Sequence, residues 1–195
     1  VVEAGPHPGG KAGVVEVDGV QVETGPSVLT LPEVFAGLFA GAGLRPSFIV
    51  GGDVTDVGTG AQWTSGRWLV VEADESDGTH LELPLHGTIL TNVEIDHLDH
   101  YGSCDGIIDS FDRYLAQIPG PKVVCGDDDV CVALADRHGA ITYGLSSACD
   151  VRAVDVVATS GAFTFTIERR GATGTYDQVG EIALPLRGLH NVTNA

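Results

Sequence analysis

Residues 68–77 have the sequence WLVVEADESD, and residues 88–97 have the sequence TILTNVEIDH. The first contains an apolar run at 68–71, the second contains a run of mostly apolar or β-branched residues at 88–93, and each leads into a group of acidic residues. Continuous apolar runs are typical of strands buried on both faces of a parallel sheet, whereas strands with one exposed face alternate apolar and polar residues. The two stretches therefore predict two buried strands, each followed by an acidic loop.

Further apolar runs extend this pattern along the chain. They predict strands at residues 47–50, 123–125 and 141–143. Between them, apolar residues at helical spacing predict helices at 104–117 and 129–137. The first helix is expected to place four apolar side chains on one face: Ile107, Ile108, Phe111 and Leu115. We therefore expect an α/β fold, a mostly parallel sheet with helices on both faces.

The pattern changes after Cys149. Residues 151–157, 162–168 and 181–186 favour strands with no helix between them, so we expect a small antiparallel β piece near the C-terminal end. Residues 188–195 are typical of the opening of a helix that is cut short.

The first thirty residues differ from the rest. Apolar and polar residues alternate on both sides of Asp18-Gly19, which predicts a hairpin of residues 14–17 and 20–23. A short helix is expected at 32–40. We therefore predict an atypical segment at 1–30 and a central domain at 31–195, truncated at its C-terminal end.

Charge and composition exclude several classes of protein. The formal net charge of −17 disfavours a nucleic-acid binder. No run reaches the roughly 18 apolar residues of a membrane helix, and the start does not have the layout of a signal peptide, so we expect a cytoplasmic protein without a membrane partner. The oligomeric state stays open. The chain has no Met, from which we expect a fragment.

Four scattered cysteines lack C-x-x-C spacing, and we expect reduced, buried thiols rather than a zinc site. His80 and His138 lie at the edges of elements, where a surface role is expected. His97 is different, because Asp96 and Asp99 flank it and a carboxylate there would fix the imidazole tautomer. His100 has no comparable argument for facing the same strand end.

The two acidic groups indicate a cation site. Ligands bind at the carboxyl ends of the strands in open parallel sheets, and carboxylate oxygens are what Mg²⁺ prefers. Carboxylates this close together in the sequence repel one another unless a bound cation neutralises their charge. The alternative, that these acids are solvated loop residues, stays open for each one taken singly.

A phosphate loop is harder to find. Residues 5–12 match G-x-x-x-x-G-K, but Ala12 replaces the Ser or Thr of the pattern and a predicted hairpin follows in place of a helix. We interpret this match as chance, and whether Lys11 contacts phosphate stays open.

Three motifs together resemble the central domain of the Mur ligases: EADESD at 72–77, TNVEIDHLD at 91–99, and GLHN at 188–191 with Asn194-Ala195. The resemblance covers residues 42–195. Within that family, EADESD is the form typical of the branch that adds L-alanine to UDP-N-acetylmuramate. The absence of Lys between His97 and Pro121 is what that branch leads one to expect.

The resemblance implies an ATP-dependent ligase of peptidoglycan synthesis. The lactyl carboxylate of UDP-N-acetylmuramate would attack the γ-phosphate of ATP, and the amine of L-alanine would then displace phosphate from the acyl phosphate. It also implies roles for individual residues. The catalytic residues would be Glu72, Asn92 and His97, with Glu72 and His97 as ligands of Mg²⁺. Substrate would contact Asp74, Glu75, Ser76 and Asp77, and ATP would contact His190, Asn191 and Asn194.

The chain also departs from the family pattern. The expected G-K-T phosphate loop is absent before residue 42, Leu189 stands where an Arg is common, and the two flanking domains are missing. We therefore expect this chain to be inactive alone. Two alternatives stay open. One is a non-catalytic relative that acts as a binding or scaffold module, and the other is a different carboxylate–amine ligase of the same superfamily.

Overall fold

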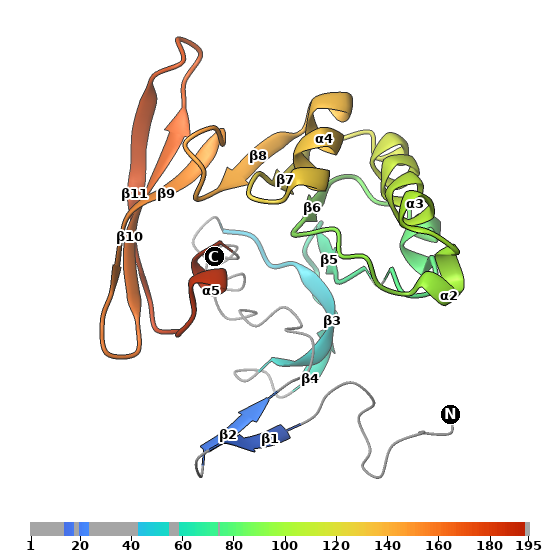
Figure 1. The fold of residues 1–195 in the computed structure, drawn as a ribbon, viewed down its shortest axis with the longest axis horizontal. Coiled ribbons are helices and arrows are strands. Elements are labelled where there is room, and N and C mark those ends of the chain that lie inside the picture. Colours follow the sequence, from blue (N-terminus) through green and yellow to red (C-terminus); the bar gives the residue numbers. More distant parts are fainter. Residues whose placement is uncertain (1–13, 18–19, 24–42, 55–58, 74, 194–195) are drawn as a thin grey trace. The chain divides into compact units, whose positions relative to one another are not determined.

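The computed structural model describes residues 14–17, 20–23, 43–54, 59–73 and 75–193 (Figure 1). The chain divides into two compact units, Val1–Glu72 and Ala73–Ala195. The boundary predicted near residue 30, the predicted helix at 32–40 and the Lys11 loop lie outside the described residues.

The first unit contains a hairpin and a small sheet. Strands β1 (Val14–Val17) and β2 (Val20–Glu23) pair antiparallel, which confirms the predicted hairpin. Strand β3 (Ser47–Val54) pairs parallel with β5 (Leu69–Val71), so the apolar runs at 47–50 and 68–71 are neighbouring strands. Strand β4 (Thr59–Gln62), which the sequence analysis did not predict, pairs antiparallel with β3 on the other side.

The second unit is built on a mixed six-stranded sheet of order β11-β10-β9-β8-β7-β6. Strands β6 (Thr88–Leu90), β7 (Lys122–Cys125), β8 (Ile141–Gly144) and β9 (Val151–Ala158) are parallel to one another. Strands β10 (Phe163–Arg170) and β11 (Tyr176–Leu184) continue the sheet antiparallel. The predicted α/β class, with its antiparallel piece near the C-terminal end, is confirmed.

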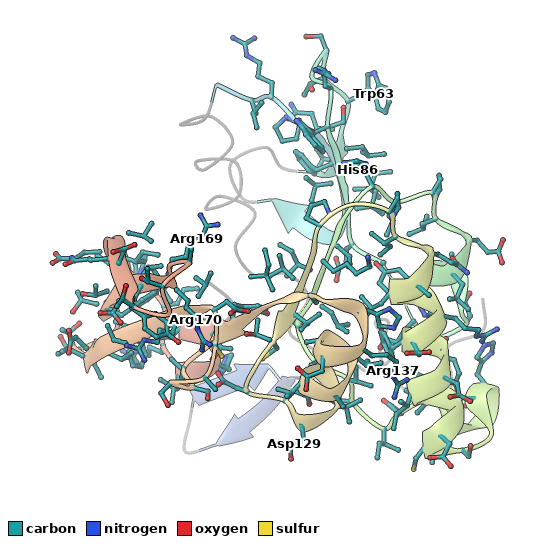
Figure 2. The ribbon with its side chains drawn as sticks, turned by 90° about the horizontal axis from the view of Figure 1, so that it is seen from above. Trp63, His86, Asp129, Arg137, Arg169 and Arg170 are labelled. Carbon is teal, nitrogen blue, oxygen red and sulfur yellow. The ribbon has the colours of Figure 1, made fainter. Side chains whose placement is uncertain are left out.

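Two helices connect the parallel strands, and both have N-terminal caps encoded in the sequence. Helix α3 (Cys104–Gln117) starts after Ser103, whose hydroxyl accepts a bond from the Gly106 amide. Helix α4 (Asp129–His138) starts after Asp128, whose carboxylate accepts from the Cys131 amide. Ion pairs from Arg137 and His138 to Asp112 join the two helices, and Figure 2 shows Arg137 beside α3.

The core of the second unit lies between these helices and the strands. Three of the four apolar residues predicted for one face of α3 are buried, and the fourth, Ile108, is half-buried. Leu115 and Val124 are fully buried at its centre. Strand β6 stops at Leu90, three residues before the predicted end of its apolar run, because Thr91 and Asn92 are exposed while Val93 returns to the core.

Short helices occupy three loops. They are the 3₁₀ helix η1 (Thr79–Glu82), α2 (Leu98–Tyr101) and α5 (Leu189–Thr193). Helix α5 confirms the helix opening expected at 188–195. No helix among the described residues is long and apolar enough to cross a membrane.

Two expectations about buried side chains are corrected. Cys104 is exposed because it starts α3 on the solvent side, whereas the other three thiols are buried as expected, and all four are free. His80 is not a surface residue: it is 2% exposed, and its ring packs against Phe111 and Tyr114. Its Nε2 lies 3.3 Å from the hydroxyl of Ser110, so an imidazole fills a core position that the loop context concealed.

Candidate functional site

The acidic segment after β5 forms a tight turn in the second unit. The Gly78 amide donates to the carbonyl of Glu75, which closes a four-residue turn over Glu75–Gly78. Gly78 has φ of 81°, a conformation that suits glycine. Within this turn Glu75 and Ser76 are half-buried and Asp77 is exposed. Asp74 lies outside the described residues.

Asp77 connects the turn to η1. Its carboxylate accepts from the backbone amide of Thr79 at 3.0 Å and from the Thr79 hydroxyl at 2.5 Å. These bonds, with a smaller contribution from the nearby His100, hold the pKa of Asp77 below its ordinary value. The Asp77 carboxylate is therefore ionised at neutral pH and fixed in direction.

The acidic loop after β6 presents polar side chains to solvent. Asn92 donates to the carboxylate of Glu94 at 3.2 Å, and both residues are exposed. The backbone amide of His97 donates to Asp96 at 2.7 Å, and the His97 ring lies 3.9 Å from the same carboxylate. The flanking acid that the sequence indicated for His97 is thus Asp96.

His97 has an unusual backbone. Its φ is 54°, and Asp155 is the only other non-glycine residue with positive φ among those described. For a residue with a side chain this left-handed conformation costs free energy, and such residues concentrate at functional sites. The left-handed turn lets His97 stand immediately before α2, at the boundary between the acidic loop and the helix.

The structure brings the two acidic segments of the second unit together through Tyr101, which the sequence did not indicate, and His100, for which it gave no argument. The hydroxyl of Tyr101, on α2, donates to the carbonyl of Glu75. The ring of His100 lies edge-on to Tyr101 and approaches Gly78 so closely that its Nε2 would be 3.2 Å from a Cβ at that position. An open hollow of about 480 Å³ borders this junction. The only sequence signal was that an aromatic residue and a His follow His97 within one helical turn.

Glu72 is the last residue of the first unit. It follows β5 directly and is exposed, and its backbone amide donates to the carbonyl of Ile49 on β3. Glu72 and His97 therefore belong to different units. Among the described residues, no group of three His, Cys, Asp or Glu side chains lies close enough to hold a metal ion by itself.

The C-terminal motif is arranged around α5. The side-chain amide of Asn191 is buried and donates to the carbonyl of Arg187 at 2.6 Å, so it stabilises the turn that leads into the helix. His190 is exposed and its ring lies against Gly188, which has φ of 95°. A hollow of about 340 Å³ beside this turn is lined in part by Arg187, which precedes Leu189 by two positions. Asn194 lies outside the described residues.

Comparison with known proteins points to one family. The family model of the Mur ligase middle domain matches residues 67–195. A UDP-N-acetylmuramate–L-alanine ligase of Rhodospirillum centenum is 41% identical over 172 residues, covering 85% of this chain and 36% of that protein. The corresponding ligase of Bradyrhizobium sp. strain ORS 278 is 38% identical, with 85% and 37% covered. The chain thus spans little more than a third of the length of these relatives.

Solved structures show the same fold. The UDP-N-acetylmuramate–alanine ligase of Thermotoga maritima superimposes with a TM-score of 0.68 at 23% identity, covering 82% of this chain and 35% of that one. The D-alanyl-D-alanyl ligase of Acinetobacter baumannii that acts on UDP-N-acetylmuramoylalanyl-D-glutamyl-2,6-diaminopimelate gives 0.59 at 18% identity, covering 85% and 38%. At these identities the likeness is one of fold.

Proposed function

The chain belongs to the Mur ligase family, whose middle domain it carries at residues 67–195, and on that premise we propose that it is the ATP-binding central domain of a ligase that joins L-alanine to UDP-N-acetylmuramate. The relatives with 38% and 41% identity, which carry that activity in their names, support the choice of amino acid and sugar nucleotide. A reaction that consumes ATP and a UDP-linked sugar belongs in the cytoplasm.

The proposed reaction has two steps. The lactyl carboxylate of UDP-N-acetylmuramate attacks the γ-phosphorus of ATP, which forms an acyl phosphate and releases ADP. The amine of L-alanine then attacks the acyl carbon, and inorganic phosphate leaves. Such a reaction depends on holding the carboxylate, the phosphate and the amine in line, so positioning residues matter as much as residues that transfer protons.

We propose that the ligase holds a magnesium ion. Mg²⁺ in phosphoryl-transfer sites is bound by one or two protein side chains and completes its shell with water and phosphate oxygens, so it needs no three-residue cluster. We propose Glu72 and His97 as its ligands, because an exposed carboxylate follows β5 and an imidazole held beside Asp96 follows the β6 loop. When bound, the ion would spread the negative charge that develops on the transferred phosphoryl group.

Other residues would contact the substrates. Glu75, Ser76 and Asp77 would face the sugar nucleotide and the water shell of the ion, and Asp74 would belong to the same group. Asn92 would act beside them from the β6 loop. We propose His190 and Asn194 as contacts of the adenosine part of ATP. Asn191 would support them through its bond to the Arg187 carbonyl.

The observation that carries the proposal is a junction within the second unit, between residues 75–78 and the helix that follows His97. The turn at Glu75–Gly78 is hydrogen-bonded to the helix that follows His97, so residues 20 or more positions apart present carboxylates and an imidazole from one region. Acids that served only as solvated loop residues would not require that fixed junction or the left-handed backbone at His97.

The test is calorimetric titration of Mg·ATP into this chain, with Glu72→Gln beside it. We expect Glu72→Gln to weaken Mg·ATP binding by about tenfold or more, since a lost metal ligand costs at least that much. Glu82→Gln, an equal loss of charge at an exposed position on η1, is the matched control and should bind like the wild type.

The same titration with Lys11→Ala tests the glycine run at 5–12. Weaker binding by that variant would mean that Lys11 contacts phosphate. A wild-type chain that does not bind Mg·ATP would contradict the proposal for this chain and favour the non-catalytic alternative.

A further inference from the structure

Tyr101, two residues after the second motif, makes a hydrogen bond to the turn that includes the end of the first motif. Its hydroxyl donates to the backbone carbonyl of Glu75, the same oxygen that accepts the Gly78 amide and closes the turn. The Tyr101 ring is half-buried and packs against the core of the second unit. One side chain therefore anchors the acidic turn to a rigid part of the molecule.

Neither of the two joined segments is stable on its own. Helix α2 has four residues, far fewer than an isolated helix needs, so tertiary contacts set its direction. The turn at Glu75–Gly78 has a single internal backbone bond. Because α2 starts directly after His97, whatever fixes α2 against the turn also fixes the backbone that presents His97.

The neighbouring residues support the same junction. The His100 ring meets the Tyr101 ring at 4.7 Å between centroids, with the planes 82° apart. Nε2 of His100 also occupies the space beside Gly78, where any side chain would crowd it. The absence of a side chain at position 78 thus permits both the left-handed turn and the close approach of α2.

We propose that Tyr101 is a positioning residue for the metal–nucleotide site: its hydroxyl locks the Glu75–Gly78 turn to α2, so that the acidic turn and His97 are held as one preorganised unit. This inference rests on the proposed function. Residues that orient the ligands of a site typically change metal affinity by 10- to 100-fold when they are lost. Tyr101 would act only through Glu75 and His97.

The chain offers a matched control for a tyrosine that only stabilises the fold. The hydroxyl of Tyr176, on β11, also donates to backbone carbonyls, those of Cys149 at 2.7 Å and Ser147 at 3.0 Å. That cluster lies at the start of the antiparallel extension and contains none of the proposed site residues. Tyr101→Phe and Tyr176→Phe therefore each remove a hydroxyl that donates to backbone carbonyls of the same unit, and Tyr176→Phe also removes an acceptor of Arg170, which makes it the more demanding control for stability.

The experiment is a Mn²⁺ titration of the chain, with Mn²⁺ standing in for Mg²⁺, followed by water-proton relaxation for wild type, Tyr101→Phe and Tyr176→Phe. Urea unfolding of each protein measures the loss of stability separately. We expect Tyr101→Phe to weaken Mn²⁺ binding about tenfold and Tyr176→Phe to leave it within twofold of wild type. Without metal, hydrogen exchange at the Gly78 amide should quicken in Tyr101→Phe alone.

Each outcome decides between two claims. If the wild type binds Mn²⁺ and Tyr101→Phe binds it with the same affinity, the positioning role is overturned and the proposed function stays intact. Wild type that does not bind Mn²⁺ contradicts the metal site itself, and the positioning role falls with it. If Tyr101→Phe fails to fold, Gly78→Ala replaces it, because a methyl group there would lie 3.2 Å from Nε2 of His100 and would strain a backbone with φ of 81°, and it should also weaken Mn²⁺ binding.

Discussion

Two acidic loops follow two neighbouring parallel strands of the same sheet, and they use their carboxylates in opposite ways. Strands β6 and β7 pair in parallel, so both loops start at the same edge of the sheet. After β7 come three consecutive acids, Asp127 to Asp129, and after β6 come Glu94, Asp96 and Asp99. From composition alone, both loops are equally good candidates for a cation site.

The loop after β7 uses two of its carboxylates internally. Asp127 accepts from the backbone amides of Leu145 at 2.6 Å and Ser146 at 2.8 Å, which fastens this loop to the β8–β9 connection. Asp128 caps α4 through the Cys131 amide at 2.7 Å. These carboxylates stabilise the fold.

The loop after β6 exposes most of its polar side chains to solvent. Two of its bonds are local, from Asn92 to Glu94 and from the His97 amide to Asp96, whose side chain is 58% exposed. It also contains the left-handed residue His97. The comparison teaches that an acidic strand end has a structural role where its carboxylates fasten the loop to another element, as Asp127 and Asp128 do. The β6 loop, which presents an imidazole among its acids, is the better candidate for a ligand site.

The largest expected effect is that of Asp127→Ala. Two backbone amides would lose a charged acceptor, and hydrogen bonds to a charged group contribute about 1.5–3 kcal/mol each when well shielded. Because Asp127 is exposed, we expect a total loss of about 2 kcal/mol in the free energy of unfolding, measured by urea denaturation. Asp127→Asn keeps one acceptor and should lose less. If the urea midpoint of Asp127→Ala equals that of the wild type, the carboxylates of the β7 loop do not stabilise the fold, and the two loops no longer differ in this respect.

Asp128→Ala should cost about 1 kcal/mol. The substitution removes the N-terminal cap of α4, and capping residues contribute roughly 0.5–2 kcal/mol. Asp128→Asn retains a capping oxygen and serves as the control in the same urea series. Equal losses in the two variants would mean that the charge of Asp128, and not its hydrogen bond, stabilises the helix.

His97→Gly should raise the free energy of unfolding by about 0.5 kcal/mol. Glycine adopts φ of 54° without the steric cost that a Cβ brings, a relief of roughly this size. The same variant should lose Mn²⁺ affinity, so stability and binding would move in opposite directions. Thermal unfolding and Mn²⁺ titration of one preparation check both. A destabilised His97→Gly would show that the imidazole stabilises the fold.

Thr79→Val should have the smallest effect on stability, and its effect is measured through the pKa of Asp77. Losing the hydroxyl bond should move the pKa of Asp77 upward, toward its ordinary value, in a carbon-detected NMR titration. Because the pKa of this carboxyl is depressed in the folded chain, its contribution to stability is present above about pH 4 and is lost as the pH falls through the depressed pKa. Thr91→Val is the control. If the pKa of Asp77 in Thr79→Val equals that in the wild type, the hydrogen bond from the Thr79 hydroxyl does not lower it.

The sequence predicted most of the fold because its signals were local. The apolar runs placed the parallel strands, and apolar residues at helical spacing predicted the helix observed at Cys104–Gln117. The fold family also followed from three short motifs, and the match at residues 67–195 confirms it.

What the sequence did not predict depends on distance in space. The bond from Tyr101 to Glu75 joins residues 26 positions apart, and nothing in either motif indicates it. The burial of His80 was not predicted for the same reason. A His in a loop resembles a surface residue in the sequence, and only the fold brings Ser110 and Phe111 next to it. The acids after β7 were not singled out, and only their amide partners show that they are structural.

The measurement that tests the account most directly is the Mn²⁺ affinity of His97→Asn set against that of Asp129→Asn. Asparagine tolerates the left-handed backbone at 97 but supplies no imidazole, and Asp129→Asn removes one exposed carboxylate from the start of α4, where Figure 2 shows it. We predict at least tenfold weaker binding for His97→Asn and no change for Asp129→Asn. The opposite result, with Asp129→Asn weakened and His97→Asn unchanged, would place the cation at the β7 loop and contradict the account.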